Sequence, residues 1–400
     1  MPARDPTGRR LRVAVVSSFP ESGDTYPQLA EAAKLLRAHF DVRWTRISER
    51  GLFFDRLVED TVLSRDVRRT LAAGGALSRD WLACRAAARG ADVVVAVDFM
   101  ALVLAASAAD RPVVLWSLDY ISDDESRFTR KINRAFLAAV RRALQRHPYV
   151  ITQDETRAAS FARSIGLPSA AFAWQLLPVA LPAVDPPPVA ADWNTKPHVM
   201  QIGGINISRC HSDFLVERFR EHDGAFDLTL HGRVYDEMLP LLAPVRGAVA
   251  VSSEMVEPDR VPAIVSRCSV GFIGNRQGHE QFALLKKACG QLVEYLRCGK
   301  PVISMGPNDL GPYVEAQRVG FHVETAAEFD AALAAIHADY AAYSQRALTL
   351  FEAEYDLADY EPGLCAFLIQ AAAARPRRRQ RTRAGAASDP RVLPAVGEAP

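Results

Sequence analysis

The chain has 400 residues, of which 49% are hydrophobic and 24% charged, with a formal net charge of +1, as in globular proteins large enough for two domains. The balanced charge and the short basic runs argue against a nucleic-acid partner. Six scattered cysteines without Cys-x-x-Cys spacing argue against a disulfide framework and a cysteine-based zinc site, so we expect no metal.

The first 180 residues alternate apolar runs with amphipathic segments. The leading apolar run is too short for a signal peptide, and no stretch approaches the length of a membrane span. A helical period occupies 28–40, and a long helix is expected near 127–146. Strands are expected at 11–18, 41–47, 91–99, 111–119 and 149–154. Continuous apolar strands separated by helices predict a parallel sheet covered on both faces.

A proline-rich stretch, 181–197, interrupts this pattern and is predicted to be a linker. A second α/β series follows in 198–348. A helical segment is expected at 349–375, and the basic tail 376–400 has a disordered composition. The fold class is therefore α/β, with two doubly wound Rossmann-like halves facing across a cleft. Ligands of such sheets bind beyond the carboxyl ends of the strands.

Two predicted strands of the second half end in glycine next to a cation. Gly203 and Gly204 end one strand, and Arg209 precedes the next helix, which favours an anion such as phosphate. The alternative is a tight turn with a surface arginine. Gly232 and Arg233 end the neighbouring strand, where Arg233 is either a second ligand contact or a solvated loop residue.

The stretch "GQLVEYLRCGKPVIS", 290–304, predicts a helix, a turn and a strand. Gly290 and Gln291 lie in the first helical turn, whose free amides can hold phosphate. Glu294, one turn later, can accept hydrogen bonds from a ribose diol. The alternative is a glutamate that the helix dipole favours near a helix start. Gly299 is expected to end the helix in a left-handed conformation.

The segment "EYLRCGKPVIS" resembles the second domain of GT-B glycosyltransferases, particularly the large retaining group that uses nucleoside-diphosphate sugars. The resemblance covers about residues 11–345. It implies that Glu294 binds the donor ribose, that Gly290 and Gln291 hold the diphosphate, and that 251–256 lie beside the nucleobase. Gly203 matches the glycine of the family's Gly-Arg-x-Lys segment, and Arg209 falls at its lysine.

Three positions depart from the family pattern. Gly204 replaces an arginine, so one positive contact is missing or supplied elsewhere. Lys286 replaces a glutamate that contacts the sugar, and it fits a phosphate or an acidic sugar instead. In the first half, Leu118 stands at a histidine position beside Asp119. Asp98 or Asp119 can orient an acceptor hydroxyl or act as its base, and the alternative for each is a strand-end cap.

The resemblance implies transfer of a sugar to a glycan, lipid-linked or small-molecule acceptor, with no cofactor beyond the donor and no metal required. A sugar-nucleotide epimerase and a non-catalytic nucleotide-sugar-binding relative are the alternatives. We expect a cytoplasmic protein. The basic amphipathic segment 129–147 fits either peripheral contact with the inner face of the membrane or a solvated helix face.

Overall fold

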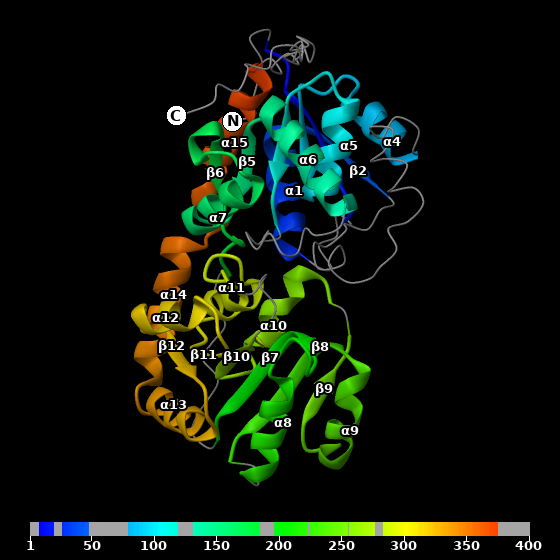
Figure 1. Cartoon of the computed structure of the whole chain (residues 1–400). Helices are drawn as coiled ribbons and strands as arrows, with labels where there is room; N and C mark the ends of the chain where they lie inside the picture. Colours follow the sequence, from blue (N-terminus) through cyan, green and yellow to red (C-terminus); the bar gives the residue numbers. More distant parts are fainter. Residues whose placement is uncertain are drawn as a thin grey trace, which may run out of the picture.

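The computed structural model describes residues 8–19, 26–47, 79–118, 131–184, 196–222, 225–254, 256–276 and 283–374. These residues form two α/β halves, stacked one above the other in Figure 1. Each half is built around a six-stranded parallel sheet. The strand orders are β2-β1-β3-β4-β5-β6 and β12-β11-β10-β7-β8-β9.

The first sheet is buried between two layers of helices. β3 is a run of valine and alanine that is buried at every position, as a sheet covered on both faces requires. One face packs on α1 and α15, and the other on α4 to α7. The strands are β1 (Arg12–Ser17), β2 (Asp41–Arg46), β3 (Val93–Val97), β4 (Val113–Trp116), β5 (Tyr149–Thr152) and β6 (Ala173–Leu176). The helices of this half are α1 (Pro27–His39), α4 (Arg79–Ala88), α5 (Asp98–Ala108), α6 (Lys131–Arg146) and α7 (Glu155–Ile165).

The second sheet has the same layered arrangement. Helices α10, α11, α12 and α14 cover one face, and α8 and α13 cover the other. Its strands are β7 (His198–Ile205), β8 (Asp227–Val234), β9 (Ala250–Ser252), β10 (Val270–Gly274), β11 (Val302–Met305) and β12 (Gly320–Val323). Its helices are α8 (Ser212–Glu221), α9 (Leu239–Leu242), α10 (Val261–Val265), α11 (Gly290–Arg297), α12 (Leu310–Ala316), α13 (Ala326–Ala338) and α14 (Tyr340–Glu354).

The chain crosses between the halves twice. Leu181 accepts a hydrogen bond from Leu357 N at 3.0 Å and donates to Tyr355 O at 3.1 Å, so the two crossings run side by side. The last helix, α15 (Leu357–Ala373), then packs on the first sheet (Figure 1). The predicted domain boundaries remain predictions, and 185–195 and 375–400 lie outside the described residues.

The segment 236–245, whose sequence predicts one helix, is broken into η3 (Asp236–Met238), α9 and η4 (Ala243–Val245). Pro240 and Pro244 explain the breaks, because each removes a backbone donor and starts a new helical turn. Five helices and strands were not predicted: α4, α7, β6, α12 and β12.

Candidate functional site

The start of α11 is fastened to the end of β7, which creates the centre of the candidate site. The Gln291 amide donates to the carbonyl oxygen of Ile202. One turn later, the Tyr295 hydroxyl accepts from Ile202 N at 3.0 Å and donates to Met200 O at 2.8 Å. These bonds place the first turn of α11 against Gly203.

Gly203 and Gly232 are neighbours in the β7–β8 register, and both have positive φ. A Cβ on Gly232 would lie 2.1 Å from the carbonyl oxygen of Gly203. The close approach of β7 and β8 is therefore enough to require glycine at 232, without any ligand. A Cβ on Gly203 would meet the Gln291 amide at 3.3 Å, whereas one on Gly204 would meet Asn206 at 3.2 Å. The structure thus brings Gly203 and Gln291 together and explains Gly232 by packing.

Arg209 lies on a well-held loop between β7 and α8. The buried Asn206 accepts hydrogen bonds from the backbone amides of Arg209, at 2.8 Å, and Cys210, at 3.1 Å. Asn206 N in turn bonds to Ser212 Oγ at 3.0 Å, where α8 begins. Arg209 itself is exposed.

A second cation, Arg276, lies beside Arg209 and was missed in the sequence. It follows β10, the neighbour of β7, and its amide donates to Arg209 O at 2.8 Å. Its guanidinium pairs with Asp213, while its Nε is buried without a partner among the described residues. A basic residue directly after a predicted strand was the available signal. Arg233 is also exposed at this sheet edge, with its guanidinium 4.9 Å from the Tyr235 ring centroid.

Glu294 is buried, with 4% of its surface exposed. Its Oε2 accepts from Arg297 Nε at 2.7 Å, and its Oε1 is buried with no partner among the described residues. Burial raises the pKa of Glu294 to about 7, and the charge and hydrogen bonds of Arg297 oppose that rise. Gly299 ends the helix at φ 64°, as predicted.

Lys286 lies on a segment that connects the two halves. Its Nζ lies 3.4 Å from Thr156 Oγ1 on α7, in the first half. Its backbone amide donates to Asp309 at 3.0 Å, and its carbonyl accepts from the Tyr355 hydroxyl at 2.6 Å. The ammonium therefore sits at the junction of the halves, near the start of α11.

In the first half, Asp98 follows β3 and begins α5 with φ 68°. Such a conformation is costly for a residue with a side chain and is often found at functional positions. The amide of Leu118, after β4, donates to Asp98 Oδ1 at 3.3 Å. Asp98 thus lies at the carboxyl edge of the first sheet, as predicted, while Asp119 lies outside the described residues.

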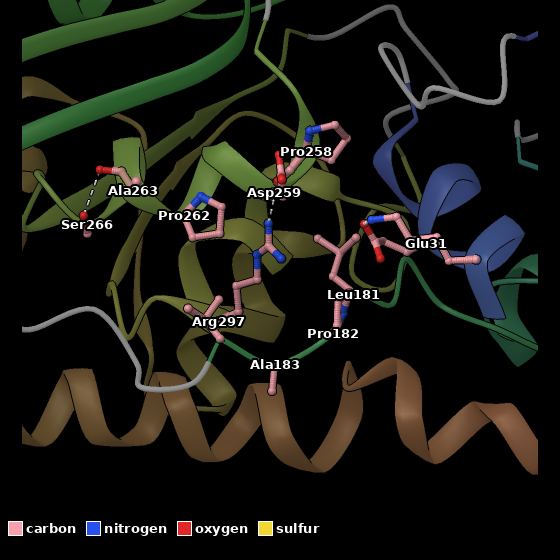
Figure 2. A pocket seen from close by; sticks show the side chains of 12 residues that line it. Glu31, Leu181, Pro182, Ala183, Pro258, Asp259, Pro262, Ala263, Ser266 and Arg297 are labelled. Carbon is pink, nitrogen blue, oxygen red and sulfur yellow. Dashed lines mark hydrogen bonds and ion pairs between the residues drawn. The ribbon is translucent and has the colours of Figure 1, made fainter. Parts of the chain in front are cut away.

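A cavity of about 490 Å³ lies between the halves, beside α11. Figure 2 shows Glu31 of α1 on one side, and Arg297 and Pro262 on the other. The crossing segment 181–184 forms part of its wall. The cavity therefore borders the helix that carries Glu294.

Two absences concern the described residues. None of their helices is long and apolar enough to cross a membrane. In the same part of the chain, no three His, Cys, Asp or Glu side chains are grouped so that they could hold a metal ion.

No protein-family model matches the sequence, and a search of curated proteins finds no match. Solved structures match nearly the whole chain. Sucrose-phosphate synthase from Thermosynechococcus elongatus has a TM-score of 0.63 at 14% identity, over 90% of this chain and 99% of that one. HepE from Anabaena, in complex with UDP, has 0.60 at 13% identity, over 90% and 100%. A trehalose-phosphate synthase (UDP-forming) from Burkholderia vietnamiensis has 0.59 at 11% identity, over 90% and 99%.

Two Rossmann-like halves, each built on a six-stranded parallel sheet, define this chain as a two-domain α/β protein. More particularly, it has the GT-B fold, which confirms the fold implied by the resemblance of its 294–304 segment. At these identities the likeness is one of fold.

Proposed function

We propose that this chain is a glycosyltransferase. It transfers a sugar from a nucleoside-diphosphate sugar to a hydroxyl of a glycan, lipid-linked or small-molecule acceptor. The observation that carries the proposal is Oε1 of Glu294, which is buried and has no partner within the described part of the chain, one turn inside a helix that starts against Gly203. A buried carboxylate oxygen without a donor suits the hydroxyls of a ribose.

The diphosphate is assigned to the adjacent anion-binding features. The first amides of α11, at Gly290 and Gln291, supply donors at a helix N-terminus. Arg209 and Arg276 supply two positive charges at the ends of neighbouring strands. Arg276 thereby replaces the arginine that Gly204 removes. These charges stabilise the diphosphate as it leaves.

In the proposed reaction, the bond between the anomeric carbon and the diphosphate oxygen breaks, and a bond from that carbon to the acceptor oxygen forms. Asp98 orients the acceptor hydroxyl or takes its proton. Lys286 faces the sugar or its phosphate across the junction between the halves. HepE from Anabaena, one of the structural neighbours, was solved in complex with UDP and with UDP-glucose, which supports a nucleotide donor.

The proposed location is the cytoplasm, with peripheral membrane contact through α6 as a further option. Two arginines of α6 donate hydrogen bonds within the protein, which favours a solvated helix face over contact with a membrane. Arg141 Nε donates to Ile165 O at 2.6 Å, and Arg146 Nη1 donates to Ala106 O at 3.3 Å. Both carbonyls lie near helix carboxyl ends, where a cation is favourable.

A thermal-shift screen of UDP-, GDP-, TDP- and ADP-sugars tests the donor site, because a ligand that binds only the folded state raises the melting temperature. We expect one nucleotide class to stabilise the protein and Glu294→Ala to remove most of that effect. If none of the four classes stabilises it, the proposal is wrong. Binding without turnover against an acceptor pool would favour a non-catalytic relative.

A further inference from the structure

Glu294 and Arg297 lie three residues apart on α11, and each side chain is 5% exposed. Arg297 reaches the carboxylate with two nitrogens, Nε at 2.7 Å and Nη2 at 2.5 Å, and both contact the same oxygen, Oε2. The other oxygen, Oε1, is buried and unpartnered within the described residues. The guanidinium of Arg297 therefore occupies Oε2 of Glu294 and leaves Oε1 available to a ligand.

Arg297 is itself held in place from another element. Its Nη2 also contacts the carbonyl oxygen of Pro258, on η5 (Pro258–Arg260), at 3.4 Å. Figure 2 shows this contact, with the guanidinium lying between Pro262 and Leu181 at the wall of the cavity. A planar group fixed at two ends has little freedom to release Oε2, so the orientation of Glu294 is fixed as well.

Arg297 favours the ionised form of Glu294, whereas burial and the nearby Glu31 oppose it. Glu31 on α1 raises its pKa, although Lys34 pairs with Glu31 at 2.7 Å. Asp259 of η5 is a further acid at the cavity wall. Cys298, directly after α11, is neutral, because burial raises its thiol pKa to about 12. Burial is the largest cause of the raised pKa of Glu294. Arg297 is the contact that favours the carboxylate form.

We propose that Arg297 is a positioning residue for nucleotide binding: it keeps Glu294 as a carboxylate and leaves Oε1 alone to accept from the ribose hydroxyls. The part that concerns ribose rests on the proposed function. Without the guanidinium, a carboxyl buried to this degree takes up a proton and becomes a donor as well as an acceptor.

The first test reads the charge of Glu294 without any ligand. The carboxyl carbon is followed by ¹³C NMR of glutamate-labelled protein from pH 5 to 9, and its resonance is assigned by its loss in Glu294→Gln. We expect Arg297→Met to raise the titration midpoint by about 1 pH unit or more and Arg297→Lys to restore it partly. Arg297→Gln is the second neutral variant, used if Arg297→Met does not fold.

Arg260→Met is the matched control, because Arg260 is exposed on the neighbouring η5 and its charge is screened by solvent. It should leave the midpoint unchanged. An identical midpoint in the wild type and in both neutral variants of Arg297 overturns the charge role.

The second test measures the ribose contact as the affinity for UDP divided by that for 2′-deoxy-UDP, with GDP and 2′-deoxy-GDP as a second pair. Titration of the phosphates largely cancels in this ratio. We expect the wild-type ratio to be highest above pH 7 and to fall as Glu294 becomes protonated. In Arg297→Met it should fall about 5-fold or more at pH 7 and recover at higher pH.

The outcomes separate the two proposals. A ratio that Glu294→Gln abolishes but Arg297→Met leaves intact at every pH overturns the positioning role and supports the proposed function. A wild-type protein that binds neither nucleotide pair overturns the proposed function and the ribose part together, while the NMR titration still decides the charge role.

Discussion

Arg157, on α7 of the first half, donates from Nε to the carbonyl oxygen of Leu284 in the second half at 2.8 Å. Its Nη1 also contacts Leu118 O at 3.1 Å and Gln153 Oε1 at 3.0 Å. Arg157 is 5% exposed. One buried guanidinium therefore connects the carboxyl end of β4 with the segment that carries Lys286.

Replacing Arg157 should weaken the junction between the halves. Arg157→Met removes the donor to Leu284 O and one of the two donors to Leu118 O, which keeps its bond from Gln153 Nε2. We therefore expect the free energy of unfolding to fall by about 2–3 kcal/mol. Urea denaturation measures this change. Arg142→Met, at an exposed position of α6, is the control and should stay within about 0.5 kcal/mol of the wild type. Equal stability of the two variants would contradict the connecting role.

Arg209 and Arg276 should contribute separately to the binding of a nucleoside diphosphate. Arg209→Ala and Arg276→Ala each remove a cation from the same sheet edge, and we expect about 10-fold weaker UDP binding for each, with a smaller salt dependence. Calorimetry at two ionic strengths measures both quantities. Arg220→Ala, on the exposed face of α8, should have no effect. Unchanged UDP affinity in Arg276→Ala would show that Arg276 only pairs with Asp213 and does not contact the diphosphate.

The raised pKa of Glu294 should make the stability of the protein depend on pH. The folded pKa, about 7, is above the ordinary value of 4.5, so the folded state holds a proton that the unfolded state releases. This contribution is fully present below about pH 4.5 and is lost as the pH rises through 7. We expect wild-type stability relative to Glu294→Gln to fall between pH 5 and 8 by about 1–3 kcal/mol. Denaturation curves that keep a constant difference would show that Glu294 does not titrate in this range.

Asp98 should affect turnover more than donor binding, because it lies on the half opposite the nucleotide site. Asp98→Asn keeps an acceptor for the Leu118 amide, so the fold should be preserved. We expect donor turnover to fall about 100-fold, as for loss of a general base, with UDP affinity unchanged. A parallel loss of UDP affinity would indicate that Asp98 supports the structure of the cleft instead.

The sequence predicted the two α/β halves because central strands such as β3 and β10 are apolar and buried throughout, and helices such as α1 have clear periods. It also predicted the positions of Gly203, Gly290 and Glu294, which follow from strand and helix ends. The short β6 and β12 lack such patterns, since they are defined by pairing with β5 and β11. The local sequence pattern alone does not predict which strands pair with β6 and β12.

The charged contacts of the site were less predictable. Glu294 and Arg297 have helical spacing, but only the packing of α11 against α10 and α14 reveals that both are buried. Arg157 and Leu284 are 127 residues apart, and no local pattern connects them. Arg276 became relevant once the sheet order placed β10 next to β7.

Lys286 should favour an acidic sugar. Its ammonium lies at the junction of the halves, where the resemblance places the sugar, and a cation there attracts a carboxylate. We expect tighter binding of UDP-glucuronate than of UDP-glucose, and we expect Lys286→Met to reduce that preference about 5- to 10-fold. Competition calorimetry with both donors measures the preference. Lys196→Met is the matched control, because Lys196 pairs with Asp227 at 2.7 Å, at the amino end of β8 and away from the site. If Lys286→Met keeps the preference for UDP-glucuronate, or if the wild type prefers UDP-glucose, Lys286 contacts Thr156 at the junction of the halves and does not bind the sugar.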